Sequence, residues 1–358
     1  ANTSANSNTA VGYSSLTVNT TGTDNTALGR DALLSNTTAS NNTALGSSAL
    51  RLNTTGTLNT AVGTGSLASS TTANYNTAVG NNTLNASTTG DYNTGLGYNA
   101  GASVTTGTQN TLIGGLAGDA LTVAFYNTAI GFAALSNDLK GVGSTAIGHG
   151  ALTAQQFGAS TNAYNTAVGL SAGAAVTTGT AQVLIGALAG DAITDADYNV
   201  VVGVGALTND TRGSRTVAIG HQALSTQNFT SATNTYNVAV GYDAGGAVTT
   251  GTQNTFIGGL SGGANTTASN NTALGYSSLG ANTTGSNNVA TGGYALSNNT
   301  TASYNTAMGY GAHQNAGTSS YNVAIGYQAL YNNDQSWGEN VAIGYQAGYT
   351  IEAGYENI

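Results

Sequence analysis

A five-residue unit, Asn-Thr-Ala-Val-Gly or a close variant, recurs along almost the whole chain and restricts its fold more than any other feature. Sixteen of the nineteen spacings between its closing glycines are 17 residues, two are 21 and one is 18. Such a register is typical of repeats that each stack on their neighbours. The glycines are Gly12, Gly29, Gly46, Gly63, Gly80, Gly97, Gly114, Gly131, Gly148, Gly169, Gly186, Gly203, Gly220, Gly241, Gly258, Gly275, Gly292, Gly309, Gly326 and Gly344.

A longer period of 72 residues lies on top of the short one and links Gly97, Gly169 and Gly241. We therefore expect one continuous repeat array over residues 1–344, with a 72-residue super-repeat within residues 93–262. The repeat fades after Gly344, close to the three glutamates of the chain. Residues 345–358 are predicted to form a C-terminal cap or a joining segment, because solenoids need their ends covered.

The pattern inside each unit predicts strands. Counting the asparagine as position zero, position two is Ala in fifteen of twenty copies, and position three is Val, Leu or Ile in eighteen. Adjacent strand residues point to opposite faces, so both faces carry apolar side chains. A 17-residue unit rich in Asn, Thr and Gly is too short and too poor in helix formers for a helical hairpin. The sequence predicts an all-β fold, a parallel β-solenoid (β-roll) of about twenty 17-residue coils.

A second apolar position in the repeat indicates which side chains lie inside the coil. Position eight is Leu in most coils, and it is glycine where position two is large: Leu112 with Gly118, Leu184 with Gly190, and Phe256 with Gly262. Such an exchange of volume is expected when two side chains share one interior. Positions two and eight are therefore predicted to lie inside the coil.

Position three then points outward and forms a long aliphatic stripe. A stripe of this length exceeds the ~300–600 Å² of the largest apolar patch on a typical soluble monomer. We expect it to be covered through closed symmetry, in a parallel bundle with the stripes packed along its axis. At ~4.8 Å per coil, the array would extend on the order of 95 Å. The predicted interface residues are Val11, Leu28, Leu45, Val62, Val79, Leu96, Ile113, Ile130, Ile147, Val168, Ile185, Val202, Ile219, Val240, Ile257, Leu274, Ile325 and Ile343.

Composition excludes several classes of function. The chain has five Lys and Arg against fourteen Asp and Glu, a net charge of −9, and neither Cys nor Pro. Nucleic-acid binding needs basic residues to displace counterions from phosphates, so no nucleic-acid partner is expected. Nor does any apolar run approach the ~18–20 residues that span a bilayer, so no membrane insertion is expected.

The repeat resembles a known family. Val217-Ala218-Ile219-Gly220 and Val323-Ala324-Ile325-Gly326 resemble the Ala-Ile-Gly repeats of the YadA-like head domains of trimeric autotransporter adhesins. The longer pattern that starts at Asn271 and runs to Gly285 is similar to repeats in tail-fibre-domain proteins of phages and bacteria. The resemblance covers nearly the whole chain. It implies a parallel β-roll trimer that serves as an adhesive or spacing shaft.

Residues that could be catalytic or bind a metal are better explained as variable positions of the repeat. Gly169-Leu170-Ser171-Ala172-Gly173 matches a nucleophile elbow, but Asn99 and Asp243 occupy the place of Ser171 one super-repeat away. His149, His221 and His313 are too far apart to share a metal and are predicted at the surface or an edge. The carboxylates Asp191, Asp195 and Asp197 lack the glycine-centred spacing of a calcium loop. No catalytic residue, cofactor or metal site is therefore predicted.

Three rows of polar or aromatic residues remain. The asparagines at position zero are predicted to form a ladder of stacked amides along the axis.

Tyrosines precede this asparagine or follow the repeat glycine in many coils. They are expected to shield coil corners, with binding of surface glycans as the alternative. Sequons at Asn19, Asn36, Asn53, Asn85, Asn265 and Asn282 would give a row of glycans if the source glycosylates.

These observations favour a non-enzymatic fibre shaft or adhesin stalk on a phage tail or a bacterial surface. Its expected location is extracellular, on a cell or a virion, and its expected partners are further copies of itself and a surface glycan or host receptor. The main alternative is a subunit of an end-to-end extracellular filament. A less favoured one is ice binding through regular Thr and Asn arrays, which bulky tyrosines would roughen.

Overall fold

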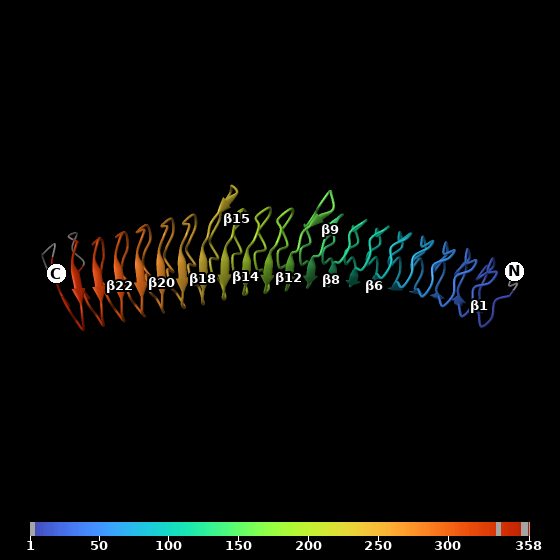
Figure 1. Cartoon of the computed structure of the whole chain (residues 1–358), viewed down its shortest axis with the longest axis horizontal. Coiled ribbons are helices and arrows are strands. Elements are labelled where there is room, and N and C mark those ends of the chain that lie inside the picture. Colours follow the sequence, from blue (N-terminus) through green and yellow to red (C-terminus); the bar gives the residue numbers. More distant parts are fainter. Residues whose placement is uncertain (1–3, 334–337, 352–356, 358) are drawn as a thin grey trace. The chain divides into compact units, whose positions relative to one another are not determined.

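The computed structural model describes residues 4–333, 338–351 and 357, and these contain strands and turns but no helix. The chain divides into two compact units, Ala1–Ala181 and Gln182–Ile358. Each unit is a parallel β-solenoid with about 17 residues per coil, and the chain makes about 19 turns (Figure 1). The predicted all-β solenoid is confirmed.

Each unit contains one long parallel sheet with ten three-residue strands, one from each coil. In the first unit the strands are β1 (Thr9–Val11), β2 (Thr26–Leu28), β3 (Thr43–Leu45), β4 (Thr60–Val62), β5 (Thr77–Val79), β6 (Thr94–Leu96), β7 (Thr111–Ile113), β8 (Thr128–Ile130), β10 (Thr145–Ile147) and β12 (Thr166–Val168). In the second they are β13 (Val183–Ile185), β14 (Val200–Val202), β16 (Val217–Ile219), β18 (Val238–Val240), β19 (Thr255–Ile257), β20 (Thr272–Leu274), β21 (Val289–Thr291), β22 (Thr306–Met308), β23 (Val323–Ile325) and β24 (Val341–Ile343).

The strands pair in register, so that equal positions of successive coils lie side by side. Thr9, Ala10 and Val11 pair with Thr26, Ala27 and Leu28, and the same alignment holds for the other pairs. In most strands the middle residue is buried and the two flanking residues are half-buried or exposed. Position two therefore faces the interior, and positions one and three face outward, as the alternation of a strand requires.

The glycine at position four is imposed by the stacking. Across the twenty coils its φ lies between 123° and 145°, a region that only glycine adopts readily. A Cβ atom on Gly46 would also lie 2.6 Å from the carbonyl oxygen of Gly63 in the next coil. In most coils the strand is thus followed by a glycine whose backbone approaches the next coil too closely for any side chain.

The interior is filled by positions two and eight, as predicted. Leucines at position eight are buried despite a left-handed backbone, with φ of 49° at Leu50 and 48° at Leu33. Leu112, Leu184 and Phe256 are fully buried. A Cβ atom on Gly262 would lie 2.5 Å from the Phe256 ring, and one on Gly118 would lie 2.8 Å from Leu112. The side chains at the two positions therefore share one space, which explains why one is small where the other is large.

The asparagines at position zero form a buried ladder, which confirms that prediction. The Oδ1 atom of Asn25 accepts the backbone N–H of Asn42 in the next coil at 3.0 Å. The Nδ2 group of Asn25 donates to the carbonyl of Ala39, fourteen residues later, at 2.8 Å. Each amide therefore joins two coils through its oxygen and reaches the end of its own coil through its nitrogen. The same pair of bonds recurs at Asn93 and Asn271.

Two coils of 21 residues depart from the regular path, one in each unit. In each case the longer coil supplies one strand of a two-stranded sheet that projects beyond the neighbouring coils, and the preceding 17-residue coil supplies the other (Figure 1). The two sheets pair β9 (Gly141–Val142) with β11 (Thr161–Asn162), and β15 (Gly213–Ser214) with β17 (Thr233–Asn234).

A buried aspartate holds each inserted segment. Asp138 accepts the backbone N–H groups of Gly141 and Phe157 at 3.0 and 3.1 Å, and the side-chain amide of Gln155 at 2.7 Å. Asp210 accepts the corresponding groups of Gly213, Phe229 and Gln227 at 3.1, 3.0 and 2.6 Å. Because both carboxylates accept several N–H donors, the insertions leave the coil along a fixed path.

Candidate functional site

The outer face of each long sheet is a long surface without charged residues. It carries positions one and three of ten coils, and no coil places a charged residue at either position. Side chains at position three are half-buried or exposed. Ile130 is half-buried, whereas Val11 is 57% exposed and Ile343 is 67% exposed. The eighteen predicted interface residues all lie in this row, together with Thr291 and Met308.

Position one differs between the units. All ten strands of the first long sheet begin with Thr. Of the ten strands in the second, seven begin with Val and three with Thr. None of the ten threonine hydroxyls in the first unit makes a side-chain hydrogen bond within the described part of the chain. The outer face is therefore hydroxyl-rich in the first unit and more apolar in the second.

Tyrosine side chains flank this face, and several cover one another. Tyr75 and Tyr92 stack with ring centroids 4.8 Å apart, and Tyr304 and Tyr321 stack at 5.0 Å. Tyr310, Tyr327 and Tyr345 continue a stacked row at 5.8 and 5.4 Å. A sugar ring stacks on the face of an aromatic ring, and these faces are already covered by neighbours. The stacked pairs therefore fit the shielding role better than glycan binding.

The histidines fall into two environments. His149 and His221 lie at the surface as predicted, and they stack on Phe132 and Tyr242 at 5.5 and 5.6 Å. The prediction of a surface position was wrong for His313, which is fully buried at position eight, where most coils have Leu. The repeat phase of His313 would have revealed this position, because it lies eight residues after Asn305.

Neither ring nitrogen of His313 has a partner with hydrogen-bond geometry among the described residues. Burial lowers the pKa of His313 to about 4, and the nearby backbone at Asn333 opposes this shift only in part. The side chain is therefore neutral at pH 7 and occupies the interior as a poorly satisfied polar group.

The residues that resemble catalytic or calcium sites in the sequence do not converge in the structure. Ser171 lies in a turn after β12, with its N–H bonded to the carbonyl of His149, and no described helix follows it. Asp191 accepts the hydroxyl of Thr208 at 2.6 Å, and Asp195 pairs with Arg212 at 3.2 Å. Across the described residues, no group of three or more His, Asp or Glu side chains is placed to hold a metal ion.

A second asparagine ladder, at position eleven, accounts for most sequons. The Nδ2 group of Asn36 donates to Asn19 Oδ1 at 2.8 Å, and that of Asn282 donates to Asn265 Oδ1 at 2.8 Å. Asn19, Asn36, Asn53, Asn265 and Asn282 are all buried. A row of glycans on these five asparagines is incompatible with the folded coils, because the modified nitrogen would lose its bonds and its space. The sequon motif alone cannot distinguish an inward asparagine from an outward one.

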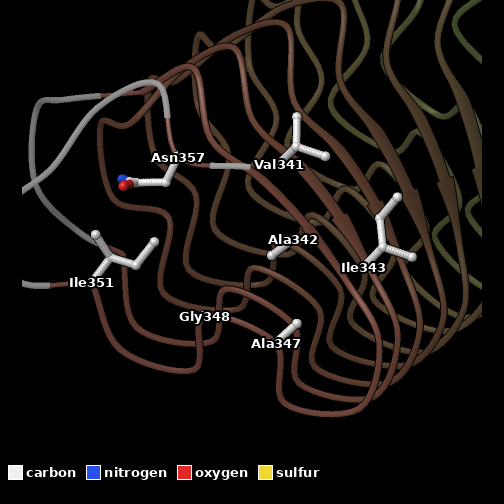
Figure 2. Close-up of a pocket in the computed structure, with 7 residues that line it drawn as sticks. All are labelled: Val341, Ala342, Ile343, Ala347, Gly348, Ile351 and Asn357. Atoms are coloured by element: carbon white, nitrogen blue, oxygen red, sulfur yellow. The ribbon is translucent and has the colours of Figure 1, made fainter.

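A pocket of about 320 Å³ lies beside β24 (Figure 2). Val341, Ala342, Ile343, Ala347, Gly348, Ile351 and Asn357 line it. Ala342 and Gly348 hold positions two and eight, so the pocket opens onto the interior side of this coil. Among the described residues that line it, Asn357 has the one polar side chain.

The predicted cap or joining segment lies partly outside the described residues, including Glu352 and Glu356. Asn357 is described, and it extends the position-zero ladder by one step. Its backbone N–H and its Nδ2 group both donate to Asn340 Oδ1, at 3.2 and 2.7 Å. The sequence shows this step only as the 17-residue spacing from Asn340.

Comparisons with known proteins do not assign the chain to a family. No family model matches it, and no curated protein sequence is significantly similar to it. In the part of the chain that the structure describes, we find no helix with the length and apolar character needed to cross a bilayer.

Proposed function

We propose that this chain is a structural shaft that assembles with copies of itself through the outer faces of its long sheets. The observation that supports the proposal most is the row of exposed or half-buried aliphatic side chains at position three. Burying this row would remove apolar surface from water at roughly 25 cal/mol per Å². Because positions one and three carry no charge, that burial requires no desolvation of ionised groups.

A parallel homotrimer is the assembly that we propose. Closed symmetry allows identical stripes to cover one another without leaving a free apolar edge. In-register stacking keeps every aliphatic side chain at the same height as its counterpart in a parallel neighbour, which suits a continuous interface. The valines at position one predict that the second unit contributes more apolar contact than the first. In this role the protein is an extracellular fibre shaft or adhesin stalk without catalytic activity.

Charged substitutions in the stripe test the proposal. Ile113→Glu with Ile130→Glu places two carboxylates on adjacent coils of the outer face. Light scattering on the native chain is expected to give three times its 35.2 kDa mass, and the double variant is expected to give the monomer mass. Gln156→Glu with Ser160→Glu adds the same charge to an exposed insertion and should leave the assembly intact. A native chain that scatters as a monomer in dilute buffer would overturn the proposal.

An end-to-end filament is the second candidate, and the pocket beside β24 is the observation that favours it. The pocket presents interior positions at the last described strand, where a further coil from another copy would cover Ala342 and Gly348. Electron microscopy distinguishes the two candidates, since only the filament predicts polymers that lengthen with concentration.

Ice binding is the third candidate, favoured by the threonines of the first unit. Their hydroxyls repeat at the coil spacing of ~4.8 Å along one face, beside the aliphatic row. A regular array of this kind can order water. Thermal hysteresis that disappears in Thr43→Val with Thr60→Val would support it, and its absence from the native protein would exclude it.

A further inference from the structure

The coil that pairs with the inserted segment of the second unit, through β15 and β17, carries groups that the other coils of this unit lack. Arg212 and Arg215 are the only Lys or Arg residues in the sequence from 182 to 358, and both border β15. Arg212 pairs with Asp195 at 3.2 Å. Arg215 makes no ion pair within the described residues, so its charge is available to a ligand.

Arg215 is held in place on two sides. Its guanidinium carbon lies 5.1 Å from the centroid of the Tyr198 ring, in cation–π geometry. Its Nη1 group donates to Asn234 Oδ1, which β17 of the insertion supplies. A guanidinium has five N–H donors in a rigid plane, so most of them remain open after the bond to Asn234.

An exposed aromatic ring lies one coil further along the same row. The backbone N–H of Thr235 donates to the carbonyl of Ser214 at 3.0 Å, which places Tyr236 in the coil beside Arg215. The side chains of Tyr198 and Tyr236 are about half exposed. The row therefore reads tyrosine, arginine, tyrosine, with the amide of Asn234 at its side.

The first unit contains the same insertion without the arginine. One super-repeat earlier, Tyr126, Asn162 and Tyr164 correspond to Tyr198, Asn234 and Tyr236, and Gly143 stands where the second unit has Arg215. A Cβ atom on Gly143 would lie 2.9 Å from the Tyr164 ring, so this ring covers the place of the arginine side chain. The duplicated insertion thus folds with or without the charge, which separates Arg215 from the requirements of folding.

We propose that Arg215 binds the carboxylate of an acidic saccharide, whose pyranose ring packs against Tyr236. A planar guanidinium matches a carboxylate through two parallel N–H bonds, and an exposed tyrosine offers an apolar face to the C–H side of a sugar. A nucleic acid does not fit, because its dense charge needs several basic residues and the chain is acidic overall. Arg215 and Tyr236 stand just before the ladder asparagine position of their coils, outside positions one and three, so the site uses none of the residues of the proposed interface.

Titration calorimetry of the full-length chain with hexagalacturonate, in buffer free of calcium, tests the proposal. We expect saturable binding that Arg215→Gly weakens on the order of tenfold or more, because a charge-assisted pair is lost. Arg215→Lys should bind with an intermediate affinity, since it keeps the charge but not the planar fork. Arg30→Gly is the matched control, because Arg30 is an exposed arginine outside the insertions, and it should bind like the native chain.

Three outcomes would overturn the proposal. The first is the absence of saturable binding to the native chain, and the second is an unchanged affinity in Arg215→Gly. The third is binding of hexaglutamate with the same affinity as hexagalacturonate, which would show that the site recognises a carboxylate and not a saccharide. Circular dichroism verifies that Arg215→Gly is folded, as Gly143 predicts. Light scattering on the same samples reports the assembly separately, so failure of one proposal is distinguishable from failure of the other.

Discussion

At the scale of single residues, the glycine at position four is the strictest requirement of the repeat. It combines a φ that disfavours any side chain with contact to the next coil. The two effects can be separated, because Gly344 has the same backbone conformation but, among the described residues, only Ala347 near its Cβ direction, at 4.0 Å.

We expect alanine to destabilise the chain more at Gly46 than at Gly344. Gly46→Ala should cost more than about 3 kcal/mol, since it adds a backbone collision to the strain of φ. Gly344→Ala should cost only the strain, on the order of 1–2 kcal/mol. Urea unfolding followed by circular dichroism measures both variants. Equal losses of stability in the two variants would show that the positive φ alone, and not the contact with the next coil, explains the need for glycine.

A buried histidine predicts that stability depends on pH. The pKa of His313 is about 4 in the folded chain, below its ordinary value of 6.5, so the unfolded chain binds the proton more readily. The contribution of the neutral side chain is complete above pH 6.5 and is lost as the pH falls toward 4. The loss should reach about 3 kcal/mol.

Thermal unfolding of the native chain and of His313→Leu, at pH values from 7 to 4, checks this prediction. Leucine is the usual residue at position eight, so the variant should be more stable and its midpoint should fall less between these pH values. The account of His313 would be wrong if the two proteins lost stability in parallel.

At the scale of the coil, the exchange between positions two and eight predicts a rescue. Phe256→Ala should cost about 3–5 kcal/mol, because it leaves a cavity beside Gly262. Gly262→Leu should also destabilise the chain, since even a Cβ atom would meet the Phe256 ring at 2.5 Å. The double variant recreates the common pair of alanine and leucine, and the φ of 59° at Gly262 is close to the 53° of Leu279.

Chemical denaturation of the two single variants and the double variant forms a cycle. A double variant within about 1 kcal/mol of the native chain would demonstrate the shared volume. Losses that simply add would mean that the two residues do not occupy one space.

The coil also shows how much of the structure the residues alone predict. The period, the strands, the interior at positions two and eight and the asparagine ladder all follow from the printed sequence, because in-register stacking repeats each contact in every coil. The second ladder was missed, since asparagine at position eleven also matches a sequon. His313 was misplaced, since a polar residue at an interior position defies the usual preference for the surface. The buried networks of Asp138 and Asp210 depend on the path of the inserted residues, which the repeat does not encode.

At the scale of the whole molecule, the proposals concern different surfaces. The outer faces of the long sheets are proposed to join copies of the chain, and Arg215, in the coil beside the insertion, is proposed to bind a ligand. Of the candidate site, the sequence predicts the outward row at position three, because strand alternation fixes it. It does not predict the environment of Arg215, which depends on Asn234 from another coil.

Single-particle cryo-electron microscopy of the purified native chain tests the assembly most directly. The account predicts three parallel solenoids around one axis, with coils ~4.8 Å apart and the row from Val11 to Ile343 facing that axis. Separate solenoids with this row in contact with solvent, or an assembly joined through any other surface, would contradict it.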